Sequence, residues 1–542
     1  MAKGTASPSR DRISELPDDL LIRILSFAPV KQAASTTLLS RRWHLQPLWL
    51  ETGTVNIDLT SEEFRHWTCP WWCGWGREGD ARAALRRRRH GLKKLTVTRP
   101  ADRDDGYLRS DCRDFSWYLK PIVFDGTCVG LLRHVDELRL ECQVAGGSSS
   151  SSAAASSPQY KYKYAADPGV EYYLSMDKLP CEDFRVLDIT GCCLQEVTTA
   201  EWLWEWDWIG YPCLTTLRLR RCTVRLCDLQ NVILAAPRLA ELRLESVTFP
   251  DRPSLCGFIF DEHIHLHCPA VTSFTMVNCH IDGRTFELDA PSLICFRCAQ
   301  VPSLYFSISL KSAAPCLAQV DLESISGTAT FGPLLNTMCH ISILKLTVYS
   351  IVGDIKFGHL PLFPNLKRLV IEELCGFAMD GGLSAAATVV GDMLRRCPAI
   401  RELWIRFSWL EYLNESADDH LDADLTAYLK SSICRLQESD YCNHCKESDK
   451  PAAGSTQNFN GSWQSSLRKV VIQFQKGKLT CFQVQLVKFL AENASVLEEF
   501  EIEGGNHHGS DHIIKSKVDR WGAASSMENE APPGVGAGDI SG

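Results

Sequence analysis

The pattern that decides the fold is clearest in Leu214-Thr215-Thr216-Leu217-Arg218-Leu219 and again in Leu239-Ala240-Glu241-Leu242-Arg243-Leu244. In each stretch an apolar residue is followed by two residues, a second apolar residue, one residue and a third apolar residue. The last two apolar positions alternate with their neighbours, as in a short strand that buries one face. The spacing recurs thirteen times from residue 90 onward, in Leu92-Leu95-Val97, Val135-Leu138-Leu140, Phe184-Leu187-Ile189, Leu214-Leu217-Leu219, Leu239-Leu242-Leu244, Val271-Phe274-Met276, Leu293-Phe296-Cys298, Leu317-Val320-Leu322, Ile341-Leu344-Leu346, Leu366-Leu369-Ile371, Ile400-Leu403-Ile405, Leu467-Val470-Ile472 and Leu497-Phe500-Ile502.

The distance between successive copies indicates the architecture. From Leu214 the first positions are 25, 32, 22, 24, 24, 25 and 34 residues apart. Periods of about 20–29 residues with this pattern are typical of leucine-rich repeats, in which each unit adds a strand to a shared core. A meander of unrelated strands is the alternative, and thirteen recurrences disfavour it. We predict a leucine-rich-repeat solenoid, shaped as a horseshoe, over residues 85–410.

The residues between the inward strand positions are expected to face outward along the concave surface of such a solenoid. The middle of this row is basic, with Arg218, Arg243, Arg297 and Lys345, and Trp404 follows on a later repeat. Arginine matches the geometry of carboxylate and phosphate groups, so one hypothesis is a groove for an acidic or phosphorylated client segment. Ordinary solvated charge is the simpler interpretation, and we favour it.

The first fifty residues read as short helices. Pro17 suits a first helical position, Asp18 and Asp19 complement the helix dipole, and Pro29 ends the helix. These helices carry more apolar surface than they can bury alone, so they either cap the next domain or dock another chain. The first apolar stripe consists of Ile13, Leu16, Leu20, Leu21, Ile24 and Leu25.

This segment resembles a known family. Leu16-Pro17-Asp18-Asp19-Leu20-Leu21-Ile22-Arg23-Ile24-Leu25-Ser26-Phe27, with Thr36-Thr37-Leu38-Leu39-Ser40-Arg41-Arg42-Trp43, is similar to the F-box of plant proteins over residues 11–52. The resemblance implies binding to a Skp-family adaptor, and through it to a cullin, in an SCF-type (Skp, cullin, F-box) ubiquitin ligase. The residues that it implies for the adaptor contact are Leu16, Pro17, Leu20, Leu21, Ile24, Leu25, Leu39, Arg42 and Trp43.

The chain after the repeats resembles a second plant unit. Residues 466–520 contain two strand patterns around a helical segment, and Phe489-Leu490-Ala491-Glu492-Asn493-Ala494 is similar to the FBD unit that follows the repeats of many plant F-box proteins. The fold class is therefore α/β: a short helical F-box, the repeat solenoid and a small α+β C-terminal unit.

Three further segments are polar or of low complexity. Residues 145–175 read as a flexible insertion in the repeats, 411–465 as a polar insertion and 521–542 as a disordered tail. Four tryptophans alternate with mostly acidic residues, and core covering and a partner-binding patch explain them equally well. They are Trp202, Trp204, Trp206 and Trp208.

Composition limits the function classes. The chain has 542 residues, a formal charge of −9, 45% apolar and 23% charged residues, as in an ordinary globular protein. This charge argues against general nucleic-acid binding, and no stretch is long and apolar enough for a membrane span. The N-terminus lacks the apolar core of a signal peptide, so we expect a reducing cytoplasmic or nuclear compartment. Arg86-Arg87-Arg88-Arg89 could be a nuclear-localisation signal, although a solvated helix face explains it more simply.

The 24 cysteines are numerous for such a compartment. Many fall where a repeat uses a small buried residue, just after or beside a strand. The ones concerned are Cys142, Cys192, Cys222, Cys279, Cys268, Cys397, Cys213 and Cys316. A zinc site at Cys434, Cys442, His444 and Cys445 is the competing interpretation, which we do not adopt because a second well-spaced pair of ligands is absent.

No catalytic motif stands out. The sequence contains no glycine-rich phosphate loop, nucleophile elbow or H-E-x-x-H helix. His263, His265 and His267 read as polar decoration of a strand. We therefore predict a non-enzymatic substrate receptor without a cofactor, whose repeats bind a client protein that the sequence does not identify. The alternatives are a protein-binding scaffold outside any ligase and a small-molecule-dependent receptor.

Overall fold

The structure is a computed structural model that falls into two compact units, residues 1–282 and 283–542. Each is described by itself. The described residues are 13, 15–39, 41–58, 92–99, 135–142, 172–176, 179, 183–195, 210–250, 263–281, 285–299, 307–311, 314–324, 332–348, 361–374, 390, 393–407, 463–473, 486, 487, 490, 491 and 493–503.

The N-terminal helices are short and begin after prolines. Pro17 precedes the first helix as its N-cap, one position earlier than the sequence suggested, and Pro29 has the same role in the second helix. Asp18 and Asp19 occupy the first turn, where negative charge complements the helix dipole. The elements are α1 (Asp18–Leu25), α2 (Val30–Ser35), η1 (Thr36–Leu38), α3 (Arg41–Leu45) and η2 (Leu48–Leu50).

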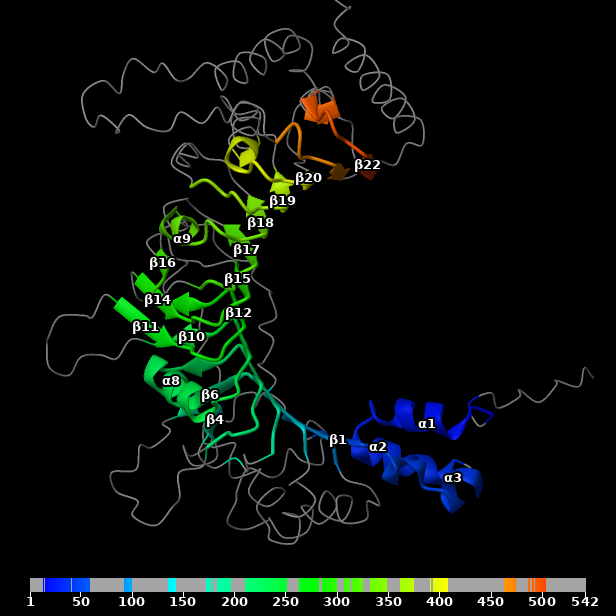
Figure 1. Cartoon of the computed structure of the whole chain (residues 1–542). Coiled ribbons are helices and arrows are strands. Elements are labelled where there is room, and N and C mark those ends of the chain that lie inside the picture. The colour runs from blue at the N-terminus through cyan, green and yellow to red at the C-terminus, as the bar shows by residue number, and fades with distance from the viewer. Residues whose placement is uncertain are drawn as a thin grey trace, which may run out of the picture. The chain divides into compact units, whose positions relative to one another are not determined.

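A ladder of parallel strands forms the first unit (Figure 1), in the order β1-β2-β3-β5-β7-β9-β12. Apolar residues pair with apolar residues across it, since Leu217 lies opposite Leu187 on one side and Leu242 on the other. The strands are β1 (Thr54–Asp58), β2 (Lys94–Arg99), β3 (Glu137–Cys142), β5 (Val186–Thr190), β7 (Thr216–Arg220), β9 (Glu241–Glu245) and β12 (Ser273–Val277).

The second unit contains a ladder of the same kind, in which Leu344 pairs with Val320 and Leu369. Its order is β15-β17-β18-β19-β20-β21-β22. The strands are β15 (Cys295–Ala299), β17 (Gln319–Ser324), β18 (Ile343–Val348), β19 (Arg368–Leu374), β20 (Glu402–Phe407), β21 (Lys469–Gln473) and β22 (Glu499–Glu503).

Shorter elements lie between the ladder strands. In the first unit β13-β10-β8-β6-β4 form a second parallel sheet, and the Gln230 side chain of α8 bonds both backbone polar groups of His267 in β11, at 2.7 and 3.0 Å. In the second unit β14 pairs with β16, which α9 contacts. The elements are β4 (Tyr172–Ser175), β6 (Cys192–Gln195), β8 (Thr223–Val224), α8 (Leu226–Ala235), β10 (Thr248–Phe249), β11 (His263–His267), β13 (His280–Ile281), β14 (Thr285–Asp289), β16 (Ser307–Leu310) and α9 (Gly332–Thr337).

A left-handed residue leads from the ladder to the second sheet in four successive repeats of the first unit. Gly191, Arg221, Ser246 and Asn278 have φ angles of 73°, 50°, 53° and 53°. Where the next ladder strand is followed by another such turn, the backbone N–H of the left-handed residue donates to the carbonyl of the last residue in that strand. Gly191 does so to Arg220 at 2.9 Å. The turn therefore joins neighbouring repeats as well as the two sheets.

The recurring apolar triplets form the core, as predicted. In the first twelve all three side chains are buried, and in the last Ile502 is buried while Leu497 and Phe500 are half-buried. The sequence pattern missed β1, whose triplet is Thr52-Val55-Ile57 with a buried threonine in the first position. Residues 172–175, which the sequence assigned to an insertion, form β4, so that insertion ends earlier than predicted.

The predicted packing role of cysteine is confirmed for six residues and wrong for two. Cys213 is half-buried and Cys316 exposed, because both lie in the turn before a strand, at positions that do not enter the core. The thiol of Cys222 reaches the carbonyls of Arg220 and Ile189 at 3.3 and 3.4 Å. Cys279 makes the equivalent contacts two repeats later, with the carbonyls of Val277 and Leu244, both at 3.5 Å. The six that are buried are Cys142, Cys192, Cys222, Cys268, Cys279 and Cys397.

Burial should protect these thiols from alkylation. It raises the pKa of Cys222, Cys279 and Cys397 to about 12, so at pH 8 almost no thiolate is present. We expect iodoacetamide at pH 8 to modify the exposed Cys227 and Cys316 in the native protein, and the three buried thiols only after unfolding in urea. Peptide mass spectrometry reads this out, and equal native labelling of both groups would contradict the buried positions.

Several predictions lie outside the described residues. They concern Trp202, Trp204, Trp206 and Trp208, the arginine run 86–89, the cysteine–histidine group Cys434, Cys442, His444 and Cys445, nearly all of the insertion 411–465 and the tail 521–542. They stay predictions, as do the other domain boundaries.

Candidate functional site

The N-terminal helices bury one face and expose another. Their core consists of Leu21, Leu25, Ala33, Trp43, Leu48 and Trp49. Eleven large apolar side chains are exposed in the described part of the chain, and seven of them belong to this short segment. Such a concentration of exposed apolar groups marks a surface that another molecule covers. We call it the apolar docking surface: Ile13, Leu20, Ile24, Phe27, Leu38, Leu39 and Leu45.

The nine residues that the resemblance implies for the adaptor contact separate into two sets. Leu21, Leu25 and Trp43 are buried in the helical core beneath the docking surface. Residues four apart on a helix share a face, and the face that holds Leu21 and Leu25 is the inward one, so their contact with an adaptor stays a prediction. Leu20, Ile24, Leu39 and Pro17 are exposed, and Leu16 and Arg42 are half-buried.

Arg42 holds the segment together. Its guanidinium forms an ion pair with Asp18 and donates to the carbonyl of Leu16 at 3.0 Å. These contacts join α3 to the start of α1, so Arg42 fixes the relative position of the helices that carry the docking surface.

Four residues of the docking surface, Ile13, Phe27, Leu38 and Leu45, are not among the nine that the resemblance implies for the adaptor contact. Phe27, Leu38 and Leu45 are among the most exposed apolar side chains of the described residues. The sequence contained one signal for this surface, because the segment has more apolar residues than three short helices can bury. The spacing of these residues alone did not indicate which apolar side chains are exposed.

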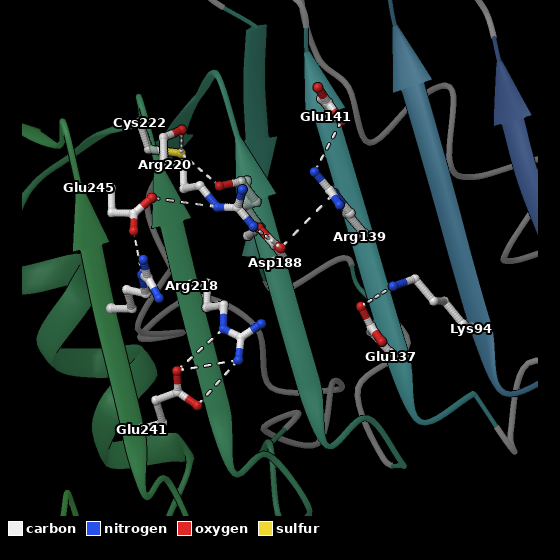
Figure 2. A network of polar contacts seen from close by, with 12 residues as sticks. Lys94, Glu137, Arg139, Glu141, Asp188, Arg218, Arg220, Cys222, Glu241 and Glu245 are labelled. Atoms are coloured by element: carbon white, nitrogen blue, oxygen red, sulfur yellow. Dashed lines mark hydrogen bonds and ion pairs between the residues drawn. The ribbon is translucent and has the colours of Figure 1, made fainter. Parts of the chain in front are cut away.

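The second candidate surface is the outer face of the ladder, formed by the strand residues whose side chains alternate with the core positions. Its middle row runs in register through Thr96, Arg139, Asp188, Arg218 and Arg243, and the last two are arginines that the sequence predicts for this face. In the first unit Arg139, Asp188 and Arg243 of this row are linked by polar contacts, while Arg218 forms a separate pair with Glu241 (Figure 2).

A buried carboxylate lies at the centre of this network. Asp188 on β5 is only 3% exposed, and Arg139 and Arg220 point toward it from β3 and β7 (Figure 2). Its Oδ2 lies 2.5 Å from Nη2 of Arg220 and 4.0 Å from Nε of Arg139. Glu141 and Glu245 approach the same two arginines, at 3.5 and 3.8 Å. Carboxylates of the same face therefore neutralise the arginines on this part of it.

The predicted client-binding arginines of the first unit have acidic neighbours as well. Nη2 of Arg218 lies 3.3 Å from Oε1 of Glu241 on the adjacent strand, and Arg243 forms an ion pair with Glu245. The face carries equal numbers of positive and negative side chains on β2 to β12, five of each. They are Lys94, Arg139, Arg218, Arg220 and Arg243 against Glu137, Glu141, Asp188, Glu241 and Glu245.

The cations predicted for the client surface of the second unit are paired in the same way. Arg297 lies 3.6 Å from Asp321, and Lys345 lies 2.7 Å from Glu372. Burial raises the pKa of Asp321, and the charges of Lys345 and Arg297 counteract that rise.

Trp404 on β20 is surrounded by cations of its neighbouring strands. The ring centroid lies 4.7 Å from the guanidinium carbon of Arg368 on β19 and 5.6 Å from Nζ of Lys469 on β21. Cation–π contacts of this kind fix the orientation of the indole. The predicted client residues are thus held by intramolecular partners in each unit.

The described residues offer little for other kinds of chemistry. They contain no group of three or more histidine, cysteine, aspartate or glutamate residues arranged to hold a metal ion. None of their helices combines the length and the apolar content that a bilayer crossing requires.

Known proteins share these features. The F-box domain family matches residues 13–46. An FBD-associated F-box protein of Arabidopsis thaliana is 47% identical over 466 residues, which cover 79% of this chain and 91% of that protein. A putative F-box protein of the same plant is 25% identical over 399 residues, 67% of this chain and 68% of its own length. An Arabidopsis F-box/FBD/LRR-repeat protein is 46% identical over 61 residues, 11% of this chain and 13% of that one.

Proposed function

Because the chain belongs to the family of FBD-associated F-box proteins, we propose that it is the substrate-recognition subunit of an SCF-type ubiquitin ligase. F-box proteins in general bind Skp-family adaptors, and the docking surface is the part of this chain that would make the contact. The adaptor would connect the chain to a cullin in the cytoplasm or the nucleus. The chain itself would supply proximity and orientation, while partners carry out the chemistry.

The observation that carries this proposal is the apolar docking surface over a compact helical core. Seven exposed apolar side chains within the first 45 residues suit a permanent or tightly bound partner. Their supporting core contains Leu21, Leu25 and Trp43 of the F-box resemblance. The proposal extends to the ladders, which we interpret as a leucine-rich-repeat solenoid whose outer face binds a client protein.

Assembly with recombinant adaptor and cullin tests the proposal. The full chain should co-purify with both, and Leu16→Ala/Pro17→Ala should lose them, because Leu16 packs on the helical core and Pro17 precedes α1. Circular dichroism of the variant checks that the helices still form. Binding by neither form, or equal binding by both, would leave a protein-binding scaffold as the better description.

Client binding by the outer face has its own test. Arg218→Glu with Arg243→Glu should abolish capture of clients in cells whose proteasome is blocked, if these guanidiniums contact the client. The charge swap Arg218→Glu/Glu241→Arg keeps the intramolecular pair of the structure. Recovery of binding by the swap would show that the pair only stabilises the sheet, and Arg185→Glu, at an exposed arginine outside the row, is the matched control.

A small molecule could be part of the client surface. Client capture that disappears after extensive dialysis of the purified receptor, and returns with the dialysed fraction, would favour such a receptor. Capture that survives dialysis would favour a direct protein contact.

A further inference from the structure

The N-terminal helices and the strand ladder meet at Asn56 of β1. The side-chain amide of Asn56 donates from Nδ2 to the carbonyl of Ser26 at 2.8 Å and to that of Ala28 at 3.3 Å. The backbones of Pro29 and Asn56 also form an isolated parallel bridge. The segment between α1 and α2 therefore lies along the edge of β1 opposite β2, beside the ladder in Figure 1.

This arrangement resolves two structural needs at once. Carbonyl groups at the C-terminal end of a helix lack partners within the helix, and Ser26 is the C-cap of α1. An edge strand exposes unpaired backbone groups that other chains can join. The Asn56 amide supplies hydrogen-bond donors to the carbonyls at the end of α1. The segment around Pro29 covers part of the exposed edge of β1.

Asn56 belongs to the outer face. It pairs in register with Thr96, which pairs with Arg139, so it begins the middle row of the first unit. Its neighbours Val55 and Ile57 enter the core. The residue that contacts the docking helices is thus part of the same row of side chains that the proposed client would meet.

The N-terminal helices are also connected to β1 through the short segment after η2. We call this segment, together with the contacts of Asn56, the joint. Only residues 51–53 separate η2 from β1, and Thr52 is buried, with its hydroxyl 3.0 Å from the carbonyl of Trp49 and 2.9 Å from that of Thr54. The carbonyl of Gly53 accepts hydrogen bonds from the backbone N–H groups of Lys93 and Lys94, at 2.9 and 3.1 Å. The joint is therefore held by the chain on one side and by Asn56 on the other.

We propose that Asn56 is a positioning residue, which fixes the orientation of the adaptor-docking helices to the outer face of the first unit. The inference rests on the proposed function, because orientation matters when a bound client has to meet a ubiquitin-carrying partner. A fixed joint limits the client lysines that can reach that partner, and a loose joint would spread modification over more of them.

Energy transfer between two dyes on the full chain tests the joint directly. The dyes are placed at Gln32 on α2 and at Arg238 in the first unit, both exposed, through click-reactive amino acids, because the chain has 24 cysteines. Asn56→Ala and Asn56→Asp remove the donors, and we expect either to broaden the single-molecule distance distribution at least twofold. Thr96→Ala, the register partner on β2, is the matched control and should leave the width unchanged.

A second measurement, adaptor binding, tests the proposed function separately from the positioning role of Asn56. Recombinant Skp-family adaptor should bind the Asn56 variants within about twofold of the wild type, because the docking surface is unaltered. Failure of the wild type to bind the adaptor would contradict the proposed function and leave the distance result valid. An unchanged width in both Asn56 variants, even with a lowered unfolding temperature, would overturn the positioning role, as would equal broadening in Thr96→Ala.

Discussion

Charging the docking surface is expected to abolish adaptor binding while the protein stays folded. In Leu20→Glu/Ile24→Glu both substitutions fall on exposed positions of α1, where the side chains are 47% and 52% exposed, so no core packing is lost. On binding, the two carboxylates would lose water without gaining a cationic partner, which costs several kcal/mol. We expect the adaptor Kd to rise at least ~100-fold, equivalent to about 2.7 kcal/mol, in isothermal titration calorimetry.

Two further variants make the result specific. Leu234→Glu introduces a charge at an exposed leucine of α8, outside the docking surface, and should bind the adaptor as the wild type does. Leu21→Ala removes a fully buried side chain of the helical core and should lower the stability of the helices by about 2–5 kcal/mol. If the doubly charged variant binds within threefold of the wild type, the adaptor does not use this face of α1.

Gly191→Ala is expected to destabilise the first unit strongly. Gly191 has a φ of 73°, which costs an alanine about 1–2 kcal/mol. An added Cβ would also lie 2.3 Å from the carbonyl oxygen of Cys142, a backbone atom that cannot swing aside. We expect the free energy of unfolding to fall by about 3–5 kcal/mol in urea titrations followed by tryptophan fluorescence.

The neighbouring repeats provide a control of opposite sign. Ser246 has the same left-handed conformation two repeats further along the first unit, but it carries a side chain. Ser246→Gly should relieve this strain and either leave stability unchanged or raise it by up to about 1 kcal/mol. A gain from both Ser246→Gly and Gly191→Ala would mean that the turn does not have the described geometry.

The strand ladders could be predicted because the apolar positions of each triplet indicate locally which side chains are buried. The alternation in Leu217-Arg218-Leu219 determines which side chains enter the core, whatever the neighbouring repeats do. The pattern failed where a polar residue took an apolar position, as Thr52 does before β1. It also failed for the second sheet, whose strands of two to four residues, such as Thr223–Val224, are too short to show a period.

The candidate surfaces depend on distant partners, and for that reason the sequence described them only in part. The helical pattern places Leu20 with Ile24 and Leu21 with Leu25, and both pairs read as equally apolar. Packing by Trp43 and other residues decides that the second pair is inside. Likewise, Glu241 lies opposite Thr216 in the strand register and reaches Arg218 diagonally, a contact that the sequence does not show because the connection between the two strands has an irregular length.

The balanced charge of the outer face bears on how fast a client can find the first unit. A groove of unpaired arginines would attract acidic chains from a distance and raise their rate of encounter. On β2 to β12, five cations paired with five anions produce almost no field beyond the Debye length. We therefore expect client association at the unsteered rate of about 10⁵–10⁶ M⁻¹s⁻¹, nearly independent of salt, so that selection among clients takes place after contact, through how long each one stays bound.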